Sequence, residues 1–173
     1  MTLLIRPTNA ADIPAITRIY AHAVMHGTAT FELEPPDEAE MLRRFDKLRA
    51  GPFPYVVAEI DGAVAGYAYA GAFRERPAYR FTVEDSIYIA PQMYRRGIGR
   101  ALLTRLIADS EAAGFRQMIA VIGDSAQAAS IAVHRACGFK DAGVFAAVGY
   151  KFGRWLDTVQ MQRTLGEGST TKP

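Results

Sequence analysis

A six-residue segment near the middle of the chain, RRGIGR, has the residue types of an anion-binding turn. Its two glycines let the backbone turn tightly, so that several N–H groups point outward at the positive end of a following helix dipole. Arginines beside them can add charge-assisted hydrogen bonds to phosphate oxygens. The segment consists of Arg95, Arg96, Gly97, Ile98, Gly99 and Arg100. It indicates a site for a phosphate-bearing ligand; the alternative is an ordinary helix start with solvated arginines.

Other motifs that could bind a ligand or take part in catalysis give weaker indications of a site. The turn is not the dinucleotide fingerprint, because Leu102 stands where the third glycine belongs, and no Gly-Lys-Ser/Thr of a Walker loop is present. Cys137 precedes a glycine and has no basic partner that the sequence forces near it, so packing is favoured over a nucleophilic role. His22 and His26 have a helical metal-binding spacing but no third ligand. No metal site is predicted.

Length, charge and cysteine content limit the class of protein. The chain has 173 residues and a net charge of +2 from 20 basic and 18 acidic residues, which favours one domain and disfavours nucleic acid as a partner. A single cysteine excludes an internal disulfide and a cysteine-based zinc site, and a reducing cytoplasm is the predicted location. The start of the chain lacks a signal-peptide pattern, and no apolar run is long enough to cross a membrane.

The elements that must hold the anion-binding turn follow from apolar periodicity. In the first half we expect a strand at 3–5, a helix starting at Asn9, a second helix starting near Asp37, and strands at 55–60 and 64–70 joined by an Asp61-Gly62 turn. Ile13, Ile16, Tyr20 and Val24 form the inner face of the first helix, and Met41, Leu42, Phe45 and Leu48 that of the second.

The second half continues with a strand at 85–90, a helix after the turn, a buried strand at 118–122, a helix at 128–137 and two strands around 140–148 and 156–163. The tail at 166–173 has no apolar residue and is expected to be disordered. This order predicts a mixed α/β sheet with helices on both faces.

Several motifs together resemble the GNAT-type N-acetyltransferases, specifically the phosphinothricin and methionine sulfoximine acetyltransferase group. The segments that carry the resemblance are EIDGAVAGYAYAGAF at 59–73, TVEDSIYI at 82–89, RRGIGRALL at 95–103, AVIGDSAQAASIAVHRACGF at 120–139 and VGYKFGRWLD at 148–157. The resemblance implies one GNAT domain over 1–165, with a central sheet of about seven strands splayed at the strand that binds acetyl-CoA. It also implies acetyl-CoA as co-substrate and a homodimer.

The resemblance also assigns cofactor contacts. The main chain of Ile87, Tyr88 and Ile89 would pair with the pantetheine arm, and the turn at 95–100 would wrap the pyrophosphate. Gln127 stands where the family commonly has an asparagine that contacts the arm, so binding with altered geometry is expected. Tyr94 replaces the usual Gln or Arg at the start of the turn, where the contact is largely main-chain.

Acetyl transfer to an amine needs a base, because an alkylammonium with a pKa of about 10 cannot attack until it loses a proton. The resemblance places Glu84 in that role, directly or through water; the alternative is a strand-end salt bridge. His134 matches a histidine with a proposed catalytic part and is otherwise a packed, hydrogen-bonded residue. Tyr88 and Tyr150 are alternative acids. Main-chain N–H groups of Tyr88 or Ile89 would stabilise the oxyanion.

The acceptor is expected to be a small amino-acid-like molecule. The resemblance aligns the acceptor site with Phe31, Arg74, Glu75, Arg76, Pro77, Tyr79, Asp85 and Ser86. Arginines there have an evident use against a carboxylate or phosphinate, although a solvated hairpin edge explains most such charges. Two alternatives remain open: acetylation of another metabolite or a protein amine, and a CoA-binding sensor without catalysis.

Overall fold

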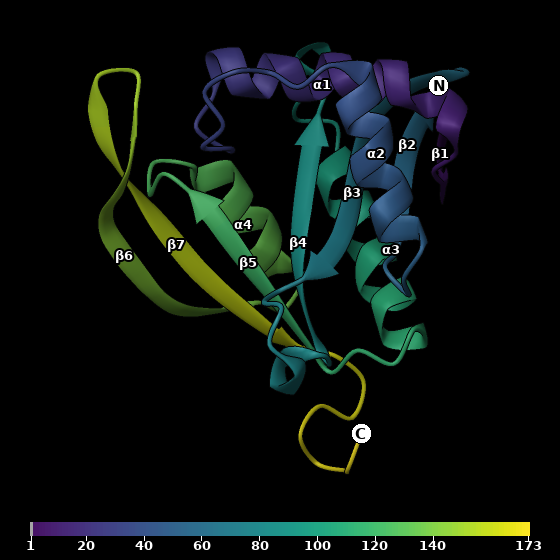
Figure 1. Cartoon of the computed structure of the whole chain (residues 1–173), viewed down its shortest axis with the longest axis vertical. Coiled ribbons are helices and arrows are strands. Elements are labelled where there is room, and N and C mark those ends of the chain that lie inside the picture. Colours follow the sequence, from purple (N-terminus) through teal and green to yellow (C-terminus); the bar gives the residue numbers. More distant parts are fainter. Residues whose placement is uncertain (1) are drawn as a thin grey trace.

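A computed structural model describes residues 2–173 and shows a seven-stranded sheet with α-helices on both faces (Figure 1). The strands are β1 (Leu3–Pro7), β2 (Tyr55–Ile60), β3 (Ala63–Ala72), β4 (Thr82–Ile89), β5 (Gln117–Gly123), β6 (Lys140–Lys151) and β7 (Arg154–Thr164). The α-helices are α1 (Ile13–His26), α2 (Glu38–Arg49), α3 (Ile98–Ala112) and α4 (Ala128–Ala136). The strand order is β1-β2-β3-β4-β5-β7-β6, and β4–β5 is the parallel pair in an otherwise antiparallel sheet. The predicted mixed α/β architecture is confirmed.

Two separate apolar clusters hold the helices to the sheet. One cluster joins α1 and α2 to one face, with Ile16, Phe45 and Tyr67 among its buried members. The other joins α3 to the opposite face through Leu102 and Leu106, and α4 packs on the same side. The predicted inner face of the first helix is buried. In the second helix Leu42 is exposed, so its predicted place on the inner face of that helix is wrong. The reason is that α2 buries only a narrow face.

Local signals placed two boundaries well. Asn9 and Asp12 form a reciprocal capping box that starts a short 3-10 helix, Ala10–Asp12, directly before α1. Asp61 and Gly62 both have positive φ values, of 49° and 80°, and connect β2 to β3. These are the backbone conformations that a two-residue hairpin turn requires.

The strands β4 and β5 separate after a short stretch of pairing. Thr82–Asp85 pairs with 117–120, whereas the remainder of β5 continues only along β7. Figure 1 shows the two strands diverging toward their carboxyl ends. Beyond Asp85, the side of β4 that faces β5 has no strand partner within residues 2–173. This is the splay that the family resemblance implies, and it leaves main-chain groups of β4 available to another molecule.

The C-terminal segment 166–173 forms turns beside Arg116. The Arg116 guanidinium donates to Thr171 Oγ1 at 3.1 Å and to the Lys172 carbonyl oxygen at 3.4 Å. The disorder expected for this segment in solution stays a prediction. Within residues 2–173, no helix has both the length and the apolar character needed to span a bilayer.

Candidate active site

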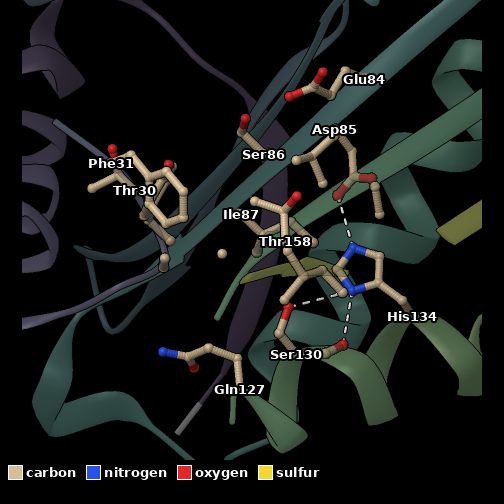
Figure 2. A pocket seen from close by; sticks show the side chains of 16 residues that line it. Thr30, Phe31, Glu84, Asp85, Ser86, Ile87, Gln127, Ser130, His134 and Thr158 are labelled. Carbon is tan, nitrogen blue, oxygen red and sulfur yellow. Dashed lines mark hydrogen bonds and ion pairs between the residues drawn. The ribbon is translucent and has the colours of Figure 1, made fainter. Parts of the chain in front are cut away.

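A pocket with a volume of about 290 Å³ opens where β4 and β5 separate (Figure 2). Five of the predicted site residues on β4 line it, together with predicted residues from a loop and from α4. The lining residues are Ala29, Thr30, Phe31, Glu84, Asp85, Ser86, Ile87, Tyr88, Ala120, Val121, Ile122, Gly123, Gln127, Ser130, His134 and Thr158. The structure thus brings the predicted base, the predicted histidine and part of the predicted acceptor site to one cavity.

Side chains on β4 reach this pocket from both faces of the sheet. Successive strand residues point to opposite faces. Tyr88 packs edge-on against Tyr20 of α1, whereas Asp85 contacts His134 of α4 on the other side. Glu84 shares the Tyr88 face because the two residues are four apart in the strand. The open splay lets groups from both faces line one cavity.

Glu84 has the protonation behaviour of a base that works near neutral pH. Burial of its half-buried side chain is the larger cause, and the adjacent Asp85 charge the smaller one, that together raise the pKa of Glu84 to about 7. An ordinary glutamate would already be fully ionised at that pH and would be a weaker base. The salt-bridge alternative receives no support, because Glu84 takes part in none of the ion pairs found within residues 2–173.

His134 and Asp85 form a buried pair. The distance from His134 Nε2 to Asp85 Oδ2 is 2.9 Å, and the two side chains are 5% and 2% exposed. His134 Nδ1 donates to the Ser130 carbonyl oxygen at 2.8 Å (Figure 2). Both ring nitrogens therefore face acceptors, which favours the doubly protonated imidazolium beside an ionised carboxylate. Asp85 is among the residues that line the same pocket, and its Oδ1 is buried with no hydrogen-bond partner within residues 2–173.

The electrostatics of the pair agree with this geometry. Desolvation acts to lower the pKa of His134, but the hydrogen bond and charge of Asp85, with the Ser130 carbonyl, outweigh it and raise that pKa. A ring that uses both nitrogens in this way has no free N–H for a proton relay. Of the two roles considered for His134, that of a packed, hydrogen-bonded residue fits the geometry best.

A loop at 28–32 forms one wall of the pocket and is tied to several elements. Gln127 Nε2 donates to Thr28 Oγ1 at 3.0 Å, and the Thr28 hydroxyl donates to Asp124 at 3.2 Å. The Tyr20 hydroxyl lies 2.8 Å from Thr30 Oγ1. Gln127, predicted to contact the cofactor arm, thus lies at the pocket and uses its amide to hold this wall.

The Phe31 ring packs closely against two glycines, Gly123 of β5 and Gly149 of β6. A Cβ on Gly123 would lie 3.0 Å from the ring, and a Cβ on Gly149 would overlap it. Only glycine allows this approach of ring to backbone at these two positions. Phe31 is therefore fixed between β5 and β6 at the edge of the pocket.

The predicted phosphate turn has the backbone geometry of an anion site. Gly97, the residue before α3, has a φ of 77°, and Arg95 has a φ of 63°. The first N–H groups of α3 are at the positive end of its dipole, and its first turn contains no acidic residue. Arg95, Arg96, Gly97 and Arg100 are exposed and Gly99 is partly exposed, whereas the Ile98 side chain is buried in the core, so that Ile98 offers only its main chain.

The predicted acceptor loop does not line the pocket. Arg74, Glu75, Arg76, Pro77 and Tyr79 are all exposed on the connection between β3 and β4, ahead of Glu84. The Arg74 guanidinium carbon lies 5.1 Å from the centre of the Phe73 ring and 5.8 Å from that of Tyr79. This loop is near in sequence to the base but separate from the pocket wall.

Sequence reasoning missed Ala29 and Thr30 beside the predicted Phe31, and it also missed pocket residues on other elements. Ser130 lies four residues before His134, and the helical spacing of the two was a usable signal. Thr158 on β7 and the backbone of 120–123 come to the pocket through strand pairing, for which local sequence carries no signal. Cys137 and Tyr150 are not among the lining residues, and no metal-binding group of three or more ligands occurs within residues 2–173.

Comparisons with known proteins identify similar chains along nearly the full length. The family model described as "Acetyltransferase (GNAT) domain" matches residues 5–160. The phosphinothricin N-acetyltransferase of Alcaligenes faecalis is 55% identical over 98% of this chain and 86% of its own length. The L-methionine sulfoximine/L-methionine sulfone acetyltransferase of Salmonella typhimurium is 40% identical over 95% and 96%. The crystal structure of a GNAT superfamily phosphinothricin acetyltransferase from Sinorhizobium meliloti in complex with AcCoA superposes with a TM-score of 0.97 at 56% identity, covering 100% of this chain and 94% of that one.

Proposed function

The chain belongs to the GNAT acetyltransferase family, and from this premise we propose that it transfers acetyl from acetyl-CoA to the α-amine of a small amino acid or analogue. Phosphinothricin and methionine sulfoximine are the proposed acceptors, after the names of the similar enzymes. The observation that carries the proposal is Glu84, whose pKa is raised to about 7 in the pocket between the separated strands. No metal takes part in the proposed reaction.

Acetyl-CoA fits two features of the chain. On its unpaired side β4 offers the main-chain N–H and C=O groups of Ile87 and Ile89, as an amide-containing pantetheine arm needs, whereas those of Tyr88 face β3. The turn at 95–100 offers main-chain N–H groups and arginines to the phosphates. The acetyl group supplied by the bound co-substrate would then enter the pocket that Glu84 lines.

Glu84 is the proposed base. As a carboxylate it removes a proton from the acceptor ammonium, directly or through water, and the amine nitrogen attacks the thioester carbon. A C–N bond forms, the C–S bond breaks, and CoA leaves as a thiolate that takes up a proton. Of the two predicted donors, we assign oxyanion stabilisation to the main-chain N–H of Ile89, because that of Tyr88 faces β3. The acceptor and acetyl-CoA are bound together in this scheme, so the transfer is direct.

His134 is a positioning residue in this scheme. Both of its ring nitrogens are used, one by Asp85 and one by the Ser130 carbonyl. It holds the Asp85 carboxylate in place beside the pocket, next to Glu84 in β4.

The acceptor's acidic groups are assigned to cations of the exposed loop. Arg74 and Arg76 lie outside the pocket wall, on the connection that enters β4 just before Glu84, and we assign to them the outer carboxylate or phosphinate of an acceptor whose amine is at Glu84. Ser86 and Phe31 line the pocket beside the amine position. A pocket of about 290 Å³ is suited to a small amino-acid-like acceptor.

The deciding experiment measures CoA thiol release from acetyl-CoA with phosphinothricin and with methionine sulfoximine. Reactions without acceptor and with a lysine-containing peptide serve as controls. Turnover of either compound well above both controls is expected. Turnover of the peptide alone would favour a protein acetyltransferase, and cofactor binding with no transfer across an amine panel would favour a CoA sensor.

The homodimer is also proposed, with the β6–β7 hairpin as its surface. Six apolar side chains on the hairpin are each at least 56% exposed: Val144, Phe145, Val148, Tyr150, Phe152 and Trp155. β6 is an edge strand, and Figure 1 shows the hairpin extending from the body. A second copy would cover these side chains and the unpaired edge. Sedimentation should give a dimer that Phe145→Glu converts to a monomer.

The proposed location is the cytoplasm.

A further inference from the structure

The strand β6 touches the body of the protein through very few side chains. Of its twelve residues only Gly149 and Lys151 are buried, and the others are exposed. The burial of Gly149 is explained by the Phe31 ring that lies against it. Lys151 is the unusual one, because its side chain is 4% exposed and lysine is almost never fully buried without a reason.

Lys151 makes one well-defined polar contact. Its Nζ donates to the Thr30 carbonyl oxygen at 2.9 Å, across 121 residues of sequence. The ammonium also lies 5.1 Å from the centre of the Phe152 ring. Desolvation lowers the pKa of Lys151, and the Glu32 charge opposes this only in part. Burying an ammonium is costly, so the contact with Thr30 must be worth retaining.

The Thr30 carbonyl belongs to the pocket wall. Thr30 and Phe31 both line the cavity, and the Thr30 hydroxyl is already held from the α1 side by Tyr20. Lys151 holds the same residue by its main chain from the opposite side, and Gly149 receives the next side chain. The loop is therefore held from two elements, by Tyr20 of α1 and by Lys151 of β6.

We propose that Lys151 is a specificity-determining positioning residue, which fixes the loop at 28–32 so that Phe31 closes the acceptor side of the pocket. The proposal rests on the proposed acetyltransferase function. Without the ammonium, the Thr30 carbonyl loses its donor, and the loop loses its hydrogen bond to β6. The acceptor then meets a looser wall, whereas Glu84 on β4 and the turn at 95–100 keep their places.

The test compares Lys151→Met with Lys140→Met. Both lysines lie on β6, but Lys140 is exposed at the far end of the strand and is a matched control. Methionine keeps the length of the side chain, and apolar residues often replace buried charges without loss of stability. We expect the acceptor KM to rise about tenfold in Lys151→Met, with kcat and the acetyl-CoA KM within about twofold of wild type. Lys140→Met should match wild type.

A double variant asks whether Lys151 acts through the loop. Phe31→Leu alone should raise the acceptor KM, and Lys151→Met added to it should raise KM by no more than about twofold further. Fully additive losses would show that Lys151 acts elsewhere. Melting temperatures and acetyl-CoA binding confirm that each variant is folded, and Lys151→Leu serves as a second apolar replacement.

The results test the role of Lys151 separately from the proposed acetyltransferase function. If wild type turns over neither compound, the proposed function fails and the KM test has no substrate. If wild type is active and Lys151→Met behaves like Lys140→Met, the inference on Lys151 is overturned. The same holds if neither apolar variant folds, because Lys151 would then serve global stability rather than the pocket.

Discussion

Glu84 and His134, the two residues predicted to move protons, approach the pocket from opposite faces of β4. Glu84 lies on the face that Tyr88 shares with α1, whereas His134 reaches the strand from α4 through Asp85, the residue next to Glu84. The two therefore have different environments and different tasks. Burial gives Glu84 a pKa suited to a base, and an ion pair occupies the ring of His134.

The pH dependence of the reaction should report Glu84. Its carboxylate is the active form, so kcat/KM for the acceptor should rise through a step at about pH 7. The acceptor ammonium, with a pKa of about 10, contributes no step in this range. Glu84→Gln should remove the step and lower kcat by about 100-fold or more, while the acetyl-CoA affinity stays near wild type. An unchanged profile in Glu84→Gln would exclude Glu84 as the base.

The same carboxyl should make stability depend on pH. Its folded pKa of about 7 lies above the ordinary 4.5, so the folded protein binds more protons than the unfolded chain between those values. This group therefore destabilises the fold increasingly as pH rises from 4.5 to 7. Glu84→Gln should melt higher than wild type at pH 8, and the difference should shrink at pH 5. Glu59→Gln, at a carboxyl paired with Arg6, serves as a contrasting control and should not stabilise the fold at pH 8.

The Asp85–His134 pair should act as one unit in unfolding experiments. Asp85→Asn or His134→Gln leaves the other buried group without its charged partner, at an expected cost of about 3–5 kcal/mol in the free energy of unfolding. The double variant should cost less than the sum of the two single losses. Since the pair raises the pKa of His134, its contribution is complete below about pH 6.5 and is lost as pH rises through the folded pKa. Denaturant titrations at pH 6 would detect this coupling, and strict additivity would argue against the pair.

Gly149 should be sensitive to a single added methyl group. A Cβ at this position overlaps the Phe31 ring, so Gly149→Ala must displace that ring or β6, at an expected cost of about 1–3 kcal/mol. The acceptor KM should rise while acetyl-CoA binding is kept. Adding Phe31→Leu should recover part of the lost stability, because the smaller side chain leaves room for the methyl. Calorimetry of the three variants measures this, and no recovery would mean that the overlap is relieved elsewhere.

Arg100 should contribute to cofactor affinity and not to acceptor binding. It is exposed in the first turn of α3, beside free main-chain N–H groups. Arg100→Ala is expected to weaken acetyl-CoA binding about fivefold to tenfold at low salt, with a smaller loss at high salt because screening already weakens the interaction. Arg43→Ala, an exposed arginine on α2, is the matched control and should bind acetyl-CoA like wild type. Titration calorimetry at two salt concentrations provides the comparison.

Local sequence determined the order of elements and the anion-binding turn. The apolar faces of α1 and α3, the Asp61-Gly62 hairpin and the glycines at 97 and 99 are patterns within a few residues, and the structure follows them. Leu42 shows the limit of apolar periodicity as a predictor of burial. An apolar residue at a helical spacing is buried only if a neighbouring element covers it.

Tertiary structure alone decided the surroundings of the charged residues in and beside the pocket. The raised pKa of Glu84 comes from desolvation, the partner of His134 lies 49 residues away, and Lys151 reaches Thr30 across 121 residues. Such burial and pairing depend on which elements pack together, which no window of sequence contains. The sequence by itself therefore determined the fold class and the glycine-rich turn at 95–100, and the packing of distant elements decided the surroundings of Glu84 and His134 and the wall of the pocket.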